Sequence, residues 1–272
     1  MKGETFNRFY FGERSSREFG LTIERKSILD GAKPDMQEYS VPGRAGVQYV
    51  WNRRWENVET VYSCYYRDRS GRGPEHMAGR IKNWLLGKPG VYRRLEDSYD
   101  LEHYRRAVYS GGLPISEEAG EFARLDICFS CDPFRYLKAG EQPAALQNGS
   151  YTADGITCAT LDIYNGFEYD SLPVIKLKAR TGQWAGVKTR LFMVPPEGGL
   201  QLIELYLPGT KGDLWDVELN TPEQRATARR GTAVELLDIN FFPVLKPGKT
   251  SFFDTDGGDM SGTVIIPNWR EL

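Results

Sequence analysis

The stretch Arg124-Leu125-Asp126-Ile127-Cys128-Phe129-Ser130-Cys131 places Leu, Ile, Phe and Cys at every second position. Side chains of a β-strand point alternately to opposite faces, so these four residues share one face. One apolar face is typical of a half-buried strand in an antiparallel sheet. The stretches 175–179 and 215–219 alternate in the same way. The sequence therefore predicts a mainly β protein.

Further strand-like runs fill the first half of the chain, separated by glycine and proline. Val, Ile and aromatic residues favour strands, whereas Gly and Pro favour turns, so each run predicts a short strand. Pro42-Gly43 is a turn signal between two of them. The runs are residues 6–11, 19–23, 36–41, 47–51, 58–66 and 91–95.

One helix is expected, over about residues 74–86. Pro74 suits a first helical position. An apolar face follows at helical spacing, made by Met77, Ile81, Trp84 and Leu85. Gly87 and Pro89 then end the helix.

The second half predicts about eight to ten short strands with turns between them, which favours a β-sandwich of the jelly-roll type. One short helix is also expected there. Thr221 would be its N-cap, Pro222 its first residue, and Gly231 its end. The C-terminal part is therefore predicted to be almost entirely β.

The chain is expected to form two domains, residues 1–136 and 146–272. Its 272 residues are comfortable for two domains. Eleven of the 15 tyrosines lie in the first part. Residues 137–145 lack periodicity and large apolar side chains, which is typical of a linker.

Composition excludes several classes of protein. The formal net charge is −2, whereas a nucleic-acid binder needs a basic surface to neutralise phosphates. The start of the chain is charged and no long apolar run is present, so we expect no signal peptide and no membrane insertion. Cys128 and Cys131 fall on opposite faces of one strand, and no second Cys pair follows. All four cysteines, Cys64, Cys128, Cys131 and Cys158, are therefore expected to be reduced thiols.

Motifs for catalysis and metal binding are missing from the sequence. No Gly-x-Ser-x-Gly elbow accompanies the two histidines, His76 and His103, which are expected to be solvated at the surface. Residues 254–259 are acidic but depart from the EF-hand spacing, and we interpret them as a turn. No glycine-rich phosphate loop is present. We expect no catalytic residue, metal or cofactor.

A set of short motifs is spread in order along nearly the whole chain. They are Phe11-Gly12, Ser15-Ser16, Phe19-Gly20-Leu21, Val41-Pro42-Gly43-Arg44 with Gly46, Ile81, Trp84-Leu85, Tyr92, Leu95, Asp97, Tyr104, Ala107, Phe122, Cys131-Asp132-Pro133-Phe134, Phe242-Pro243, Leu245, Pro247-Gly248-Lys249 and Pro267-Asn268-Trp269-Arg270-Glu271-Leu272. In this order they resemble the distal tail (Dit) proteins of long-tailed, siphovirus-type phages, especially those that infect Gram-positive hosts.

The resemblance implies an architecture and an assembly. Dit proteins join an N-terminal β-rich domain with one helix to a C-terminal galectin-like β-sandwich. Six N-terminal domains form a ring that continues the tail tube, so residues 1–136 are expected to form the ring. The ring connects the tube protein to the tail-tip hub, with the end of the tape-measure protein inside. In some members the outward domain carries receptor-binding proteins.

The resemblance therefore implies a non-enzymatic virion protein at the distal end of the tail, assembled in the host cytoplasm. The expected partner is first of all the chain itself, as a homohexamer, with rings back to back in isolation. Residues 58–66 look like an unpaired edge strand that could join neighbouring copies. The motif residues expected at interfaces are Pro42, Gly43, Arg44, Gly46, Trp84, Tyr92, Tyr104, Trp269 and Arg270.

Two other functions remain open. Aromatic rings stack on sugars, so a carbohydrate-binding module for host cell-wall sugars is the main alternative. An exposed Trp184 or Trp215 beside polar groups would favour it. A cell-wall hydrolase would need two carboxylates converging in a cleft, and the spacing of the 37 acidic residues selects no such pair.

Overall fold

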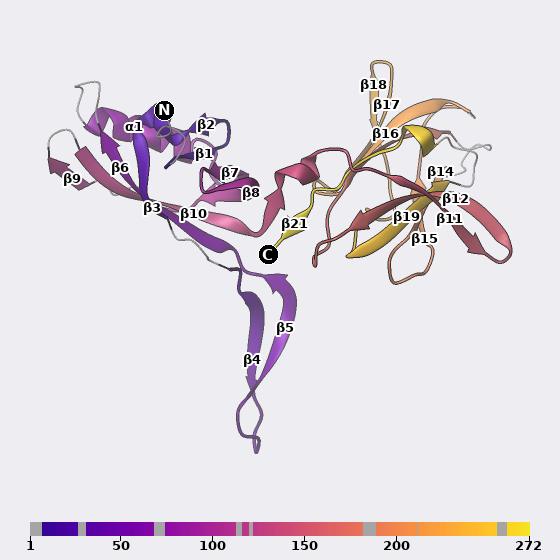
Figure 1. Cartoon of the computed structure of the whole chain (residues 1–272), viewed down its shortest axis with the longest axis horizontal. Helices are drawn as coiled ribbons and strands as arrows, with labels where there is room; N and C mark the ends of the chain where they lie inside the picture. The colour runs from indigo at the N-terminus through magenta and orange to yellow at the C-terminus, as the bar shows by residue number, and fades with distance from the viewer. Residues whose placement is uncertain are drawn as a thin grey trace. The chain divides into compact units, whose positions relative to one another are not determined.

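The structure, a computed structural model, describes residues 7–26, 31–67, 74–112, 116–119, 122–181, 189–210, 212–254 and 260–272. The chain divides into two compact units (Figure 1). Unit 1 is Met1–Arg135 with Leu272, and unit 2 is Tyr136–Glu271. Independent folding of residues 1–136 and 146–272 stays a prediction.

Unit 1 is built on one sheet, whose strand order is β2-β1-β7-β8-β10-β6-β3. The alternating stretch at residues 124–131 lies in β10. Its four alternating residues, from Leu125 to Cys131, are buried as predicted. The strands are β1 (Phe9–Phe11), β2 (Arg14–Ser15), β3 (Leu21–Lys26), β6 (Val58–Arg67), β7 (Arg93–Asp97), β8 (Asp100–Tyr109) and β10 (Phe122–Leu137). One short strand, β9 (Ser116–Ala119), also pairs with β10. Strand β21 (Arg270–Glu271) belongs to unit 2.

Strand β6 is not at an edge of this sheet, so the edge-strand prediction for residues 58–66 is wrong. β6 pairs antiparallel with β10 along Val58–Arg67 and, on its other side, with β3. Both partner strands, β3 and β10, lie more than 30 residues from β6 along the chain. The pattern within a strand shows which face is buried, but it does not identify the strands on either side.

The predicted helix is confirmed as α1 (Pro74–Leu86). Its four apolar residues are buried in one core with the sheet. Trp84 is central: its ring stacks on Phe19 at 4.3 Å between centroids and on Phe9 at 5.6 Å. Its indole N–H donates to the carbonyl of Phe11 at 3.1 Å. The Phe-Gly motifs at the start of the chain thus supply the aromatic partners of the helix.

Unit 2 is a β-sandwich, as predicted. Its two five-stranded sheets have the orders β11-β12-β19-β14-β15 and β18-β17-β16-β13-β20. Their apolar faces meet in a single core that includes Ile163, Leu177 and Leu219. The strands are β11 (Gln147–Ala153), β12 (Ile156–Asn165), β13 (Val174–Arg180), β14 (Thr189–Val194), β15 (Gln201–Leu205), β16 (Leu214–Asn220), β17 (Arg225–Arg230), β18 (Ala233–Leu236), β19 (Gly248–Asp254) and β20 (Val264–Ile266).

The short helix expected after Thr221 is absent, and that prediction is wrong. The hydroxyl of Thr221 donates to the carbonyl of Pro243 at 2.9 Å instead of capping a helix. The backbone turns at Gln224, whose φ is +51°, and continues as strand β17. Ala226 and Ala228 alternate into the sandwich core, so burial of this face favours a strand over a helix.

Residues 137–145 pack against the last residues of unit 2. A 3-10 helix, Lys138–Glu141, brings the carbonyl of Gly140 to the backbone N–H of Asn268, at 2.8 Å. Glycine is needed here, because a Cβ at Gly140 would lie 2.4 Å from the backbone nitrogen of Trp269. The segment predicted as a linker is thus held against Trp269.

The four cysteines are free thiols in very different surroundings. Cys64 and Cys131 are buried, and Cys128 and Cys158 are partly exposed. Burial raises the pKa of the Cys64 thiol to about 12 and also raises the pKa of Cys131. Since only the thiolate reacts, the two buried thiols are poor nucleophiles.

We therefore expect a thiol reagent to label Cys158 in the folded protein at least about 100-fold faster than Cys64, since both thiolate formation and access are reduced at Cys64. Peptide mass spectrometry over a time course measures both rates. Unfolding in urea provides the control and should bring the rates together. Equal labelling of Cys64 and Cys158 in the folded chain would contradict this burial.

Candidate assembly surface

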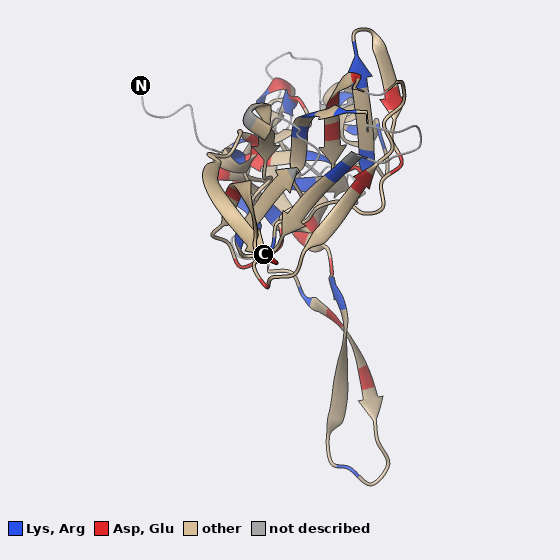
Figure 2. Cartoon of the chain, turned by 90° about the vertical axis from the view of Figure 1, so that its right-hand side faces the viewer, with Lys and Arg blue, Asp and Glu red and all other residues tan. Residues whose placement is uncertain are grey.

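A β-hairpin projects from unit 1 (Figures 1 and 2). Its strands are β4 (Pro34–Ser40) and β5 (Val47–Trp55), which form a separate two-stranded sheet. Two-stranded hairpins are at best marginally stable in water unless something covers one face. The hairpin is therefore the first candidate for a surface that acts through assembly.

The sequence at the tip accounts for its sharp turn. Pro42 and Gly43 occupy the two central positions of a turn closed by the Arg44 N–H, which donates to the carbonyl of Val41 at 3.1 Å. Gly43 has a φ of +80°, as a type II turn requires after proline. Gly46, with a φ of +84°, lets the chain enter β5. The turn predicted at Pro42-Gly43 is present.

One side of the hairpin carries four exposed apolar side chains, with Glu38 and Ser40 beside them. Met36 pairs with Trp51, and two residues along, Glu38 pairs with Tyr49, so these side chains point to the same side. Val47 extends this row toward the tip. Exposed fractions are 49% for Met36, 44% for Val47, 60% for Tyr49 and 50% for Trp51. We call these four residues the hairpin face.

The opposite side of the hairpin is also mixed, with two exposed apolar side chains and two amides. Gln37 and Gln48 lie there with Tyr39 and Val50, as the register of the two strands shows. Figure 2 shows few charged residues along the outer part of the hairpin. The hairpin face therefore carries Met36, Tyr49 and Trp51, three of the largest exposed apolar side chains of the hairpin. Exposed apolar side chains of this size are typical of a surface that packs against protein.

The base of the hairpin is fixed by polar contacts. A register shift follows Pro34, and Arg53 there has a φ of +58°. Asp35 accepts hydrogen bonds from Arg54 and from Asn52, the latter at 3.0 Å. These bonds from Arg54 and Asn52 lower the pKa of the Asp35 carboxyl. The Asp35 carboxylate therefore ties β4 to β5 beside the bulge at the base of the hairpin.

The motif residues predicted for interfaces do not form one site. Pro42, Gly43, Arg44 and Gly46 come together at the exposed hairpin tip, and Arg44 makes no ion pair within the described part of the chain. Trp84 is in the core of unit 1. The interface role of each of these residues stays a prediction.

The other motif residues have local partners. The Tyr92 hydroxyl accepts a hydrogen bond from the Asn57 amide at 2.7 Å. The Arg94 guanidinium lies 3.9 Å from the centre of the Tyr104 ring. In unit 2, Trp269 packs on the sandwich core and Arg270 donates to the carbonyl of Asp170.

The hairpin face was missed by the reasoning from sequence. Its strands were predicted as residues 36–41 and 47–51, and Val47, Tyr49 and Trp51 do alternate. Alternation predicts an apolar face, but the same pattern describes a strand buried in a core. The signal that could have separated the two cases is the proximity of Pro42-Gly43, which limits these strands to pairing with each other in a hairpin.

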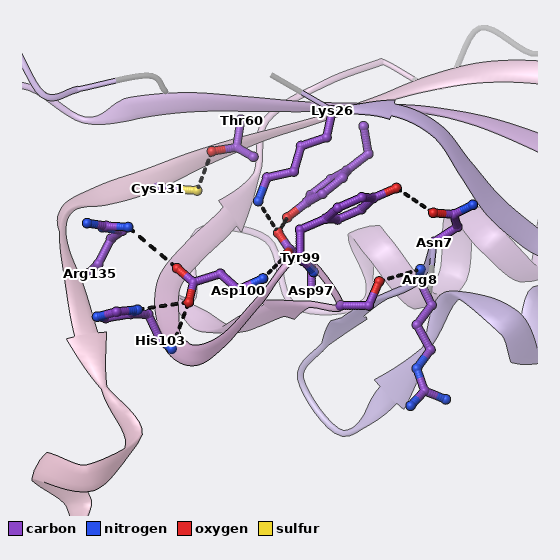
Figure 3. Close-up of polar contacts among 12 residues, drawn as sticks. Asn7, Arg8, Lys26, Thr60, Asp97, Tyr99, Asp100, His103, Cys131 and Arg135 are labelled. Carbon is purple, nitrogen blue, oxygen red and sulfur yellow. Dashed lines mark hydrogen bonds and ion pairs between the residues drawn. The ribbon is translucent and has the colours of Figure 1, made fainter. Parts of the chain in front are cut away.

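A cluster of polar side chains around Asp97 and Asp100, which we call the polar site, lies within unit 1 (Figure 3). The Asp97 carboxylate accepts from the Lys26 ammonium at 2.5 Å, the Tyr62 hydroxyl at 2.7 Å and the backbone N–H of Tyr99 at 2.9 Å. Burial, followed by the charge of Asp97, raises the pKa of Tyr62 well above its usual value. Tyr62 therefore acts as a hydrogen-bond donor that fixes Asp97.

His103 belongs to this polar site and not to the solvated surface, which corrects the prediction for it. Its Nδ1 lies 2.8 Å from the carboxylate of Asp100, and its side chain is 15% exposed. Burial raises the pKa of Asp100, but contacts with His103 and Arg135 outweigh burial and leave that pKa lowered. His76 is exposed, as predicted.

Within the described residues, no three His, Cys, Asp or Glu side chains are grouped closely enough to hold a metal ion. Within the same residues, no helix has the length and apolar character needed to cross a bilayer. Of the acidic turn at 254–259, residues 255–259 lie outside the described part.

The fold of the chain is similar to that of solved phage tail and baseplate proteins. The SPP1 Dit protein, described as a paradigm of the hub adsorption apparatus in phages that infect Gram-positive bacteria, is similar with a TM-score of 0.61 and 13% identity, over 95% of this chain and 96% of that chain. A chain of the phage p2 baseplate in its activated conformation is similar with a TM-score of 0.55 and 11% identity, over 95% and 96%.

These similarities confirm the fold that the motif resemblance implied. No protein-family model and no curated protein sequence matches the chain. At 13% identity, the similarity to SPP1 Dit concerns the path of the backbone. The function therefore has to be argued from the surfaces of this chain.

Proposed function

We propose that this chain is a structural protein of a phage tail tip, in which six copies of unit 1 form a ring that joins the tail tube to the tail-tip hub. The observation that carries the proposal is the hairpin face, a row of apolar side chains exposed by 44–60%. Assembly would remove these side chains from water, which favours association in proportion to the apolar area buried.

The fold supports this role, since the similar solved chains come from phage adsorption structures. The number six comes from the resemblance to Dit proteins. A ring requires an interface between two different surfaces whose rotation closes on itself. The hairpin supplies one such surface, and its tip presents Arg44, a guanidinium suited to a carboxylate on a neighbouring copy.

The remaining partners follow from the same proposal. The tail-tube protein would bind one side of the ring and the hub the other, with the end of the tape-measure protein inside the ring. Unit 2 would carry receptor-binding proteins where the phage has them. The protein would act without catalysis, at the distal end of the virion tail.

The mass of the purified protein tests the ring. Native mass spectrometry over a range of concentrations should show six copies, or twelve if two rings stack back to back. A closed dimer or trimer that persists at all concentrations would contradict the proposal. Assembly that appears only at higher concentration agrees with it, because association follows mass action.

A second candidate function, binding of cell-wall saccharides, is favoured by one feature of unit 2. The exposed Trp215 that would have supported it is not found, because Trp215 is buried at 5% exposure, and Trp184 lies outside the described residues. A different aromatic group, however, stands beside polar side chains. Tyr164 is 70% exposed and shares a cavity of about 540 Å³ with Asp162, Lys249 and Trp269.

The sheet register brings these groups together. Tyr164 is opposite Lys249 on β19, and Asp162 is opposite Gln147 on β11. Asp162 accepts from Thr160 at 2.7 Å and from Lys249 at 3.2 Å. An aromatic ring bordered by an amide, a carboxylate and an ammonium can stack on a sugar and hydrogen-bond its hydroxyls.

Replacing Tyr164 by alanine should weaken binding of a solubilised Gram-positive wall polysaccharide by about tenfold, because a stacking aromatic contributes roughly 1.5 kcal/mol. Glycan-array or calorimetric titration measures the change. Tyr206→Ala removes another exposed tyrosine of unit 2 and is the matched control. If both variants and the unmodified chain bind equally, this candidate function is wrong.

A further inference from the structure

The polar site of unit 1 contains a cavity of about 360 Å³ whose lining is rich in charge. Four basic side chains line it: Lys26, His103, Arg105 and Arg135. Three acidic side chains also line it: Glu96, Asp97 and Asp100. The function proposed above uses none of these seven groups.

The three acids have basic partners. Lys26 pairs with Asp97 at 2.5 Å, and Arg94, which is outside the lining, pairs with Glu96. Asp100 is held by His103 at 2.8 Å and by Arg135 at 3.5 Å, as Figure 3 shows. These carboxylates are therefore already neutralised by contacts within the site.

Arg105 differs from the other three basic residues. Its hydrogen bond within the described residues goes to the backbone carbonyl of Asp132, at the long distance of 3.4 Å. It makes no ion pair there. A guanidinium carries five N–H donors and stays protonated in proteins. Most of the donors of Arg105 thus have no protein acceptor in the described part of the chain.

Arg105 lies at a position that is partly shielded from water. The side chain is half-buried, and burial lowers the pKa of its guanidinium, with Arg135 nearby adding to this effect. Interactions with Cys131, Tyr62 and Asp132 oppose the shift in this pKa without outweighing it. A partly desolvated cation without a carboxylate partner would gain from a bound anion.

We propose that this cavity binds an oxyanion, a carboxylate or a phosphate, through the guanidinium of Arg105. Two parallel N–H···O bonds match the geometry of either group. Arg135 and His103, which hold Asp100, border the same cavity and bring further N–H donors close to it. The anion is either a free small molecule or an acidic side chain of a protein partner, and the two have the same chemistry at Arg105.

The strand supplies a matched control for the test. Arg105 and Arg106 are adjacent on β8, so their side chains point to opposite faces of the sheet. Arg106 is exposed, and its guanidinium lies 5.8 Å from the centre of the Tyr92 ring. Arg105→Gln and Arg106→Gln therefore remove the same charge, but only the first changes the cavity.

Calorimetric titration of the full chain with three probes tests the proposal: inorganic phosphate, citrate, and a short peptide of glycine and aspartate. We expect saturable binding that Arg105→Gln weakens by at least about tenfold, as loss of a charge-assisted bidentate contact predicts. Arg106→Gln should leave the affinity unchanged. Arg135→Gln, at the more exposed border of the cavity, should weaken binding by about threefold. This variant replaces Arg105→Gln as the test if Arg105→Gln does not fold.

The probes separate the two sources of the anion. Binding of phosphate or citrate without the peptide assigns a free anion, whereas preferential binding of the peptide assigns a carboxylate of a protein partner. A cavity that holds only water would give no saturable heat with any probe up to about 10 mM, and that result would overturn the proposal. Equal affinities of the Arg105→Gln, Arg135→Gln and Arg106→Gln variants would also overturn it.

Discussion

A chain carrying Tyr49→Ser and Trp51→Ser is expected to fold normally and to fail to form rings. Both side chains lie on the hairpin face, with exposed fractions of 60% and 50%, so their removal takes little from the core of a single copy. At a protein interface, by contrast, a central aromatic residue contributes about 2–4 kcal/mol. Loss of two such residues should weaken each contact by roughly a thousandfold or more.

Native mass spectrometry and thermal unfolding measure the two expected results separately. The double variant should give the mass of a single copy, with a melting temperature close to that of the unassembled parent chain. Tyr39→Ser with Val50→Ser changes the opposite side of the same hairpin and should weaken assembly much less. Rings that form equally well in both double variants would show that the hairpin face is not the interface.

Trp84→Ala should destabilise unit 1 by about 3–5 kcal/mol, the usual cost of removing a large aromatic side chain from a core. Trp84 is 5% exposed, and its loss would remove stacking on Phe9 and Phe19 and leave the Phe11 carbonyl without its indole donor. The unfolding midpoint in urea should fall accordingly. Trp84→Phe retains an aromatic ring and should cost less.

This prediction separates two roles for a motif residue. Trp84 was expected at an interface because of the resemblance, whereas the structure places it in the core of unit 1. A Trp84→Ala chain with unchanged stability but no assembly would support the interface role. Lower stability together with impaired assembly would follow from the core position, because an interface cannot persist on an unfolded unit.

Local patterns predicted much of this fold. The helix over 74–86 follows from Pro74 at its start, its apolar spacing and the residues that end it, all of which are close in sequence. The alternation in 124–131 correctly identified the buried face of β10. Likewise, Pro42-Gly43 predicted the turn now seen at the hairpin tip.

The errors concern interactions between distant residues. Residues 58–66 gave no indication that β6 would be paired on both sides, since its partners come from other parts of the chain. Thr221 has the residue type of a helix cap, but its hydroxyl bonds to Pro243 in the folded chain. In both cases, tertiary contacts decide the outcome over local preference.

The candidate sites were less predictable than the fold. Arg105 is one of 35 basic residues, and only the folded sheet shows that it borders a cavity without a carboxylate partner. The hairpin face has a recognisable alternation, yet its exposure depends on the separation of β4 and β5 from the main sheet. Sequence patterns identify apolar faces, and the three-dimensional structure shows which of them lack a neighbour.

Electron microscopy of assembled phage tails, with the protein located by a specific label, is the most direct test of the central claim. The proposal predicts label at the distal end of the tail, in a ring containing six copies or a multiple of six. Label found only along the tube shaft, or a copy number that is not a multiple of six, would contradict it.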